Sequence, residues 1–127
     1  ASLQMKAICD AHGIAYVHLL QPNQYVPDSK PLTEEELEHA YNAEQPIRER
    51  VVNGYPLLIE AGEGLRQAGV RFVDLTRMFA DERRSIYSDP CCHVNELGAR
   101  LIAERMAATI VAEHAAVAAA GGDPSDA

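Results

Sequence analysis

Hydrophobic residues recur along the chain at two spacings, which predict different elements. Near the N-terminus, Leu3, Ala7 and Ile8 follow helical spacing, and Gly13 suits a left-handed position just past a helix end. Residues 14–20 instead form a continuous apolar run of strand length, rich in β-favouring side chains. We therefore expect a short helix followed by a strand buried on both faces.

A proline-containing segment separates this strand from the next helix. Residues 21–32 contain three prolines and are expected to run over the surface as a loop. Thr33 followed by Glu36 matches a capping box, which predicts a helix start at Thr33. The glutamate run 34–36 is expected to be a solvated helix start that complements the helix dipole.

A second helical stripe begins after residue 44. Its apolar members share one face at a period of 3.6 residues and are Ile47, Val51, Tyr55, Leu58 and Leu65. Gly54 and Pro56 are expected to bend this helix, and Gly69 ends it. Residues 70–75 then form a second apolar strand.

The last helix is predicted to begin at Asn95, which suits the N-cap position. The side chains expected on its buried face are Leu97, Leu101, Ile102, Met106 and Ile110. We assign residues 1–118 to one domain, and residues 119–127, rich in small and polar residues, to a flexible tail.

The order helix, strand, helices, strand, helix predicts an α/β fold with a parallel sheet. Only two strands are evident, whereas such a sheet normally has about five or six. Two strands buried on both faces would also leave a sheet edge open. We therefore expect an incomplete domain that lacks N-terminal strands, or strand pairing with another chain.

Composition narrows the classes of function. The 127 residues carry a net charge of −8, which disfavours binding to nucleic acid, and no apolar run is long enough to span a bilayer. The three cysteines are an odd number, and a bond between the adjacent pair would be strained, so we expect free thiols. Free thiols slightly favour a cytoplasmic location, although the sequence leaves the compartment open.

The segment between the last strand and the last helix carries the candidate chemistry. Loops that follow parallel strands collect functional groups in α/β domains, and residues 85–93 include Asp89 and His93 four positions apart. A carboxylate held beside an imidazole selects its tautomer and stabilises imidazolium as it forms. Asp89 and His93 are therefore the candidate catalytic residues, with His93 as a general base.

This segment resembles a known enzyme family. Residues 87–98, followed by Leu101-Ile102-Ala103, are similar to the last conserved block of SGNH/GDSL hydrolases, in which an Asp and a His precede an Asn-x-x-Gly turn. Leu20-Gln21-Pro22, Lys30 to Thr33 and Val70 to Phe79 resemble one branch of that family.

The resemblance implies a flavodoxin-like three-layer α/β/α fold and hydrolysis of a small-molecule acyl ester. In it His93 is the general base and Asp89 the acid that orients it; no metal or other cofactor is implied. One departure stands out, because the commoner family pattern has two residues between the Asp and the His and this chain has three.

The chain lacks the Gly-Asp-Ser block that carries the nucleophile in that family. Ser85 and Ser88 lie near the pair in sequence, but neither is in a strand-to-helix elbow. We therefore expect a nucleophilic serine outside this chain. The alternative function is a non-catalytic association module, which pairs through its open sheet edge with a second copy or with a missing N-terminal segment.

Structural roles remain open for several of these residues. His93 would then only hydrogen-bond the helix end, and Asp74 would be the N-cap of a short helix after its strand rather than line a site. A metal site at Cys91 and Cys92 is disfavoured because adjacent ligands cannot easily wrap one ion; we expect one to pack in the core and the other at the site rim. His18 is expected to be a hydrogen-bonded strand residue. The remaining histidines, expected to be solvated, are His12, His39 and His114.

Overall fold

The computed structural model describes residues 1–120. Its elements, in chain order, are α1 (Ser2–Ala11), β1 (Val17–Leu20), α2 (Glu34–His39), α3 (Pro46–Gln67), β2 (Arg71–Asp74) and α4 (Glu96–Ala120). This order of helices and strands confirms the one predicted from the sequence. Of the predicted tail, residues 119 and 120 continue α4, and residues 121–127 lie outside the described part of the chain.

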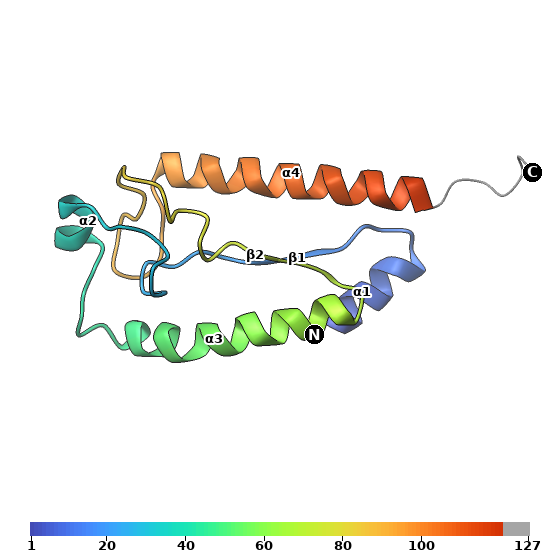
Figure 1. The fold of residues 1–127 in the computed structure, drawn as a ribbon, viewed down its shortest axis with the longest axis horizontal. Coiled ribbons are helices and arrows are strands. Elements are labelled where there is room, and N and C mark those ends of the chain that lie inside the picture. The colour runs from blue at the N-terminus through green and yellow to red at the C-terminus, as the bar shows by residue number, and fades with distance from the viewer. Residues whose placement is uncertain (121–127) are drawn as a thin grey trace, which may run out of the picture.

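The two strands form a parallel sheet, in register from Val17 beside Arg71 to Leu20 beside Asp74. In Figure 1 this sheet runs between the two long helices, with α3 along one side and α4 along the other. The fold is thus mixed α/β with a small parallel sheet. Within residues 1–120 each strand has a single strand neighbour, so each leaves one edge unpaired.

The main core lies between α3 and the sheet. Its buried members are Leu20, Tyr25, Val26, Val51, Tyr55 and Phe72. Gly62 lets β2 approach α3 closely, since a Cβ atom there would overlap the Phe72 ring. A second cluster of buried side chains, beneath the loop before α4, comprises Ala40, Phe79, Ile86 and Tyr87.

The proline-containing segment 21–32 is largely buried, so its predicted path over the surface is wrong. Most of its residues from Asn23 to Lys30 are inaccessible. Several of its polar groups are paired: Asn23 Oδ1 accepts from the Tyr25 amide at 3.0 Å, and Ser29 Oγ donates to the Asn23 carbonyl at 3.0 Å, whereas Gln24 Oε1 has no partner among the described residues. Such pairing reduces the usual penalty for burying a loop.

The capping box at the start of α2 is confirmed, with Thr33 and Glu36 each bonded to the other's backbone. The prediction that the glutamate run is simply a solvated helix start is wrong for Glu36, whose side chain is fully buried in an ion pair with Lys30. Glu34 and Glu35 are exposed, as expected.

The predicted buried faces of the helices hold only in part. In α3, Leu58 is 48% exposed, and Ile59 packs against the core in its place because the apolar row advances in steps of four from Val51. Helix α1 forms and Gly13 takes a φ of +65°, yet no residue of α1 is buried. In α4, Asn95 caps the helix through the Gly98 amide, but the helix is more exposed beyond its first turns than predicted.

In residues 1–120 no helix has both the length and the hydrophobicity needed to cross a membrane.

Candidate active site

A short backbone pairing closes the loop that carries Asp89 and His93. Tyr87 and Val94 form an antiparallel bridge, and the Ser88 amide donates to the His93 carbonyl at 2.9 Å. One residue further out, the Asn95 amide donates to the Ile86 carbonyl at 2.7 Å. The loop therefore leaves and returns at one point, directly before α4.

Inside this loop the carboxylate of Asp89 is held on both oxygens. Its Oδ1 accepts from the amides of Cys91, Cys92 and His93 at 2.8, 3.2 and 3.3 Å. Its Oδ2 lies 2.5 Å from His93 Nδ1. The hydrogen bond to His93 is the largest cause; together with the backbone amides it outweighs the opposing effect of desolvation and lowers the pKa of Asp89 to about 2. Asp89 is thus a carboxylate near neutral pH, and it holds one ring nitrogen of His93.

The backbone accommodates the three residues between Asp89 and His93. Cys92 has a φ of +141°, a region that side-chain-bearing residues rarely adopt, and Pro90 fixes the start of the turn. This turn brings the carboxylate to the imidazole despite the longer spacing. A strained residue beside two candidate catalytic groups is a common feature of functional sites.

The imidazole of His93 lies at the surface, with its side chain 71% exposed. Within residues 1–120 its only hydrogen-bond partner is Asp89, through Nδ1. The other ring nitrogen, Nε2, is therefore available to a group that approaches from outside this part of the chain.

Two buried residues of segment 21–32, absent from the candidates identified in the sequence, hold this loop from below. Gln24 Nε2 donates to the carbonyls of Asp89 and Ala40, each at 2.9 Å. Tyr25 donates its hydroxyl proton to the Pro90 carbonyl at 2.9 Å. The only clue in the sequence to the role of these two residues was that segment 21–32 directly follows the first strand, because loops that follow parallel strands meet at the same edge of the sheet.

Glu36 anchors the base of the same loop. Its Oε1 accepts from the amides of Ile86 and Tyr87 at 2.8 and 3.0 Å, while its Oε2 accepts from Lys30 Nζ at 2.7 Å and from the Thr33 amide at 2.9 Å. Burial alone would raise the pKa of Glu36, but the Lys30 ammonium and these amides lower it. A charged side chain with no solvent contact thus ties α2 to the candidate site.

Neither nearby serine is placed as a nucleophile for His93. Ser85 Oγ lies 2.9 Å from Thr33 Oγ1 and donates to Glu35 Oε2 at 2.5 Å. Ser88 Oγ donates to the backbone carbonyl of His93 at 3.2 Å, away from the ring nitrogens. Within the described residues, no hydroxyl group is bonded to the imidazole.

The other candidate residues have structural environments. His18 Nδ1 bonds Ser2 Oγ at 2.9 Å, as predicted for a satisfied strand histidine, and His12, His39 and His114 are exposed. Asp74 accepts from the Thr76 amide at 2.8 Å, but residues 76–81 form turns, so the prediction of a short helix capped by Asp74 is wrong.

Cys91 and Cys92 are free thiols, as is Cys9. Both are only half-buried, so the expectation that one packs in the core is wrong; the tight turn at Asp89 keeps the pair near the surface. Among residues 1–120, no three His, Cys, Asp or Glu side chains gather in a way that could hold a metal ion.

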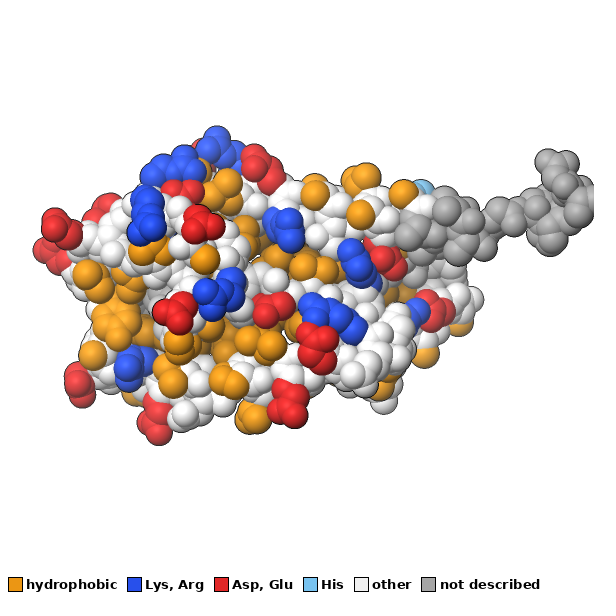
Figure 2. Space-filling model, in the orientation of Figure 1, with side chains coloured by type: hydrophobic (Ala, Val, Ile, Leu, Met, Phe, Trp, Pro, Cys, Tyr) orange, Lys and Arg blue, Asp and Glu red, His pale blue; other side chains and the backbone are white. Residues whose placement is uncertain are grey.

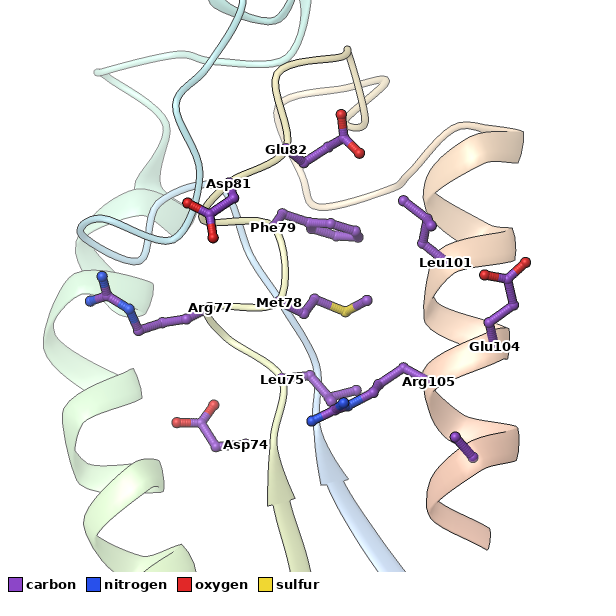
Figure 3. A pocket seen from close by; sticks show the side chains of 11 residues that line it. Asp74, Leu75, Arg77, Met78, Phe79, Asp81, Glu82, Leu101, Glu104 and Arg105 are labelled. Carbon is purple, nitrogen blue, oxygen red and sulfur yellow. The ribbon is translucent and has the colours of Figure 1, made fainter. Parts of the chain in front are cut away.

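Two cavities adjoin the carboxyl end of β2, and Asp74 lines both. One, of about 760 Å³, separates residues 74–82 from α4. Figure 3 shows Leu75, Met78 and Leu101 on its inner walls, with acidic and basic side chains around them. The other, of about 560 Å³, has more apolar walls that include Val26 and Ile59. Neither is lined by Asp89 or His93.

Comparisons of the chain with models of known protein families, with curated proteins and with solved structures find no match.

Proposed function

We propose that this chain supplies the general base and its orienting acid to a serine-dependent acyl-ester hydrolase. The main support for this proposal is the 2.5 Å contact between His93 Nδ1 and the Asp89 carboxylate, which three backbone amides hold in place. An exposed imidazole fixed in this way has the geometry of a general base. The similarity of residues 87–98 to the last block of SGNH/GDSL hydrolases supports the same function.

In the proposed reaction, His93 Nε2 takes the proton of a serine hydroxyl as that oxygen attacks the ester carbonyl. The imidazolium that forms is stabilised by Asp89 through Nδ1, and it then protonates the leaving alcohol. The serine comes from a segment outside residues 1–127, on the same polypeptide or on another one. In the second half-reaction water attacks the acyl-serine ester, and His93 takes a proton from the water and returns one to the serine oxygen.

The proposal includes a three-layer α/β/α fold completed by further strands. Helices α3 and α4 flank the two-stranded sheet, and the unpaired strand edges offer backbone groups to such strands. The 560 Å³ cavity between segment 21–32 and α3 is the proposed site for an acyl chain, because its walls are mainly apolar and it adjoins the strand ends.

The decisive variant is His93→Ala, assayed in the assembled hydrolase with a short-chain aryl ester. Loss of a triad base should lower kcat/KM by a factor of about 10³ or more. His39→Ala is the matched control, since His39 is an exposed histidine of α2 outside the loop. Activity of His93→Ala equal to that of the control would refute the assignment.

A fluorophosphonate tests where the nucleophile lies. The 127-residue chain alone should remain unlabelled, because Ser85 and Ser88 bond to groups other than the His93 ring. Covalent labelling at either serine, located by mass spectrometry, would place the nucleophile inside this chain instead.

The second candidate function is a non-catalytic association module. It is favoured by the unpaired strand edges and by apolar side chains that α1 exposes, such as Leu3 and Ile8 at 52% and 56%. Light scattering distinguishes the two functions. An association module forms oligomers or captures its missing segment. A stable monomer that binds neither a second copy nor that segment would argue against the association module.

A further inference from the structure

We propose that Cys91 and Cys92 form a redox-sensitive modification site, at which a small-molecule disulfide oxidises the two thiols to a bond with each other. Their sulfur atoms already lie 4.0 Å apart. Both side chains are partly exposed, so a small oxidant can reach them. The site lies between the two candidate catalytic residues, and its oxidation would change how they are held.

The backbone is what brings the two sulfur atoms together. In an extended segment, side chains of adjacent residues point to opposite faces and their ends lie far apart. Here Cys92 has a φ of +141°, and the turn around Asp89 places both sulfurs on the same side. A disulfide needs the sulfurs about 2.05 Å apart, so closing the bond requires side-chain rotation together with reorientation of the peptide between the two residues.

A bond between adjacent cysteines is strained, which suits a reversible modification. Consecutive Cα atoms are about 3.8 Å apart, below the range of about 4.4 to 6.8 Å found for ordinary disulfides. Strained disulfides are more oxidising and are reduced readily by thiols. The Cys91–Cys92 bond would therefore open again when the surrounding thiol pool becomes reducing.

The thiol–disulfide exchange consumes one small-molecule disulfide for each Cys91–Cys92 bond that forms. The thiolate of one cysteine attacks a sulfur of that disulfide, which forms a mixed disulfide and releases one small thiolate. The thiolate of the other cysteine then attacks the protein-side sulfur, forms the Cys91–Cys92 bond and expels the second small thiolate. Two protein thiols are oxidised, the small disulfide is reduced to two thiols, and the two thiol protons pass to them.

Oxidation acts on the candidate site through the amides that hold Asp89. The Cys91 and Cys92 amides donate to Asp89 Oδ1 at 2.8 and 3.2 Å, and closing the ring reorients the peptide between them. The Asp89 carboxylate loses part of its support. His93, which directly follows Cys92, moves with the disulfide ring. This effect on catalysis rests on the proposed function, whereas ring closure itself does not.

The third cysteine does not compete for this bond. Cys9 lies on α1, at the end of the molecule opposite the loop before α4 (Figure 1). Intramolecular oxidation is therefore expected to stop at one bond per chain.

The test treats the intact 127-residue chain in its Cys9→Ser form with oxidised glutathione. We expect both remaining thiols to be lost, the mass to fall by two hydrogen atoms without a glutathione adduct, and dithiothreitol to restore them. Two retained glutathiones or a disulfide-linked dimer would overturn the proposal. In the control, which carries Cys91→Ser in addition to Cys9→Ser, Cys92 has no partner and should keep one glutathione.

Nuclear magnetic resonance tests the link to the candidate site. Ring closure should shift the imidazole resonances of His93 and leave those of His12, which lies at the end of α1 on the opposite side of the molecule, in place. Unchanged His93 resonances in the oxidised chain would refute the coupling. Because mass and resonances need no ester turnover, a failure of the hydrolase proposal would be seen separately.

Discussion

The two ends of the molecule are built in different ways. At the end that carries Asp89 and His93, loops far apart in sequence are joined by buried polar contacts, such as those of Glu36 and Gln24. At the opposite end lie α1 and the far part of α4, which leave apolar side chains at the surface. Figure 2 shows hydrophobic side chains reaching the surface along α4 and in the band between the two long helices.

This difference separates positioning from association. A buried hydrogen bond fixes the direction of its partners, so these contacts restrict where the loop that carries Asp89 and His93 can lie. Apolar surface has no direction and is stabilised by whatever covers it. The first end therefore holds its side chains in fixed positions, as the proposed function requires, and the second leaves apolar surface uncovered among the described residues.

The largest expected effect on stability comes from breaking the buried ion pair between Lys30 and Glu36, at the end of the molecule that carries Asp89 and His93. Glu36→Ala leaves the Lys30 ammonium and the Ile86 and Tyr87 amides buried without their acceptor, so the free energy of unfolding should fall by about 3–5 kcal/mol. Urea unfolding measures it. Glu34→Ala, on the exposed side of the same helix, should change it by less than about 0.5 kcal/mol. Equal values for the two variants would contradict the proposed anchoring.

A second prediction tests packing beneath the site loop. A Cβ atom at Gly98 would lie 2.8 Å from Ile86 Cγ2 and 2.8 Å from Val94 Cβ, so Gly98→Ala should cost about 1–3 kcal/mol. Gly64→Ala in α3 meets no atom within 4 Å and should instead stabilise the helix by about 0.5–1 kcal/mol. Thermal unfolding of both variants gives the comparison, and a shift of the same sign in both would contradict it.

A third prediction concerns acid. The folded pKa of Asp89, about 2, lies below its ordinary value of 3.8, so its contribution to stability is complete above pH 4 and is lost as the pH falls through 2. Because the carboxylate is 38% exposed, solvent screening limits this contribution to less than about 1 kcal/mol. Unfolding measured from pH 5 to 2 should show a shallower loss in Asp89→Asn than in the unmodified chain. Asp81→Asn, outside the loop, is the control, and parallel curves for both variants would be evidence against the contact.

The smallest effect on stability is expected at the end of the molecule formed by α1 and the far part of α4. Ile8→Glu replaces an exposed apolar side chain of α1, so the free energy of unfolding should change by less than about 0.5 kcal/mol. If this face associates, the new charge should shift the mass found by light scattering toward the monomer. Gln67→Glu makes the same charge change at an exposed position of α3 and should leave that mass unchanged. An equal response in both variants would exclude a specific role for the α1 face.

The features predicted correctly from the sequence are mostly local. Thr33 with Glu36, Asn95 with Gly98 and the placing of Asp89 beside His93 all involve residues three or four positions apart. Hydrogen bonds over such short spans are governed by the nearby backbone, so turn and cap preferences are enough to predict them. The parallel pairing of the strands followed from the helix that connects them.

The features that the sequence did not reveal depend on contacts between distant segments. Glu36 meets Ile86 across 50 residues, and Gln24 meets Asp89 across 65. A polar pattern predicts solvent exposure until a distant partner compensates for its burial, as with Glu36 and segment 21–32. Similarly, an apolar stripe predicts burial only if another element lies over it, which α1 lacks within residues 1–120.

The sequence by itself thus determined the order of the elements, the helix caps and the pairing of Asp89 with His93, because neighbouring residues govern these. Only the tertiary structure decided which side chains are buried and which distant groups hold the loop. The physical reason is that burial and long-range hydrogen bonding are properties of packed surfaces, which form when segments far apart in the chain come together.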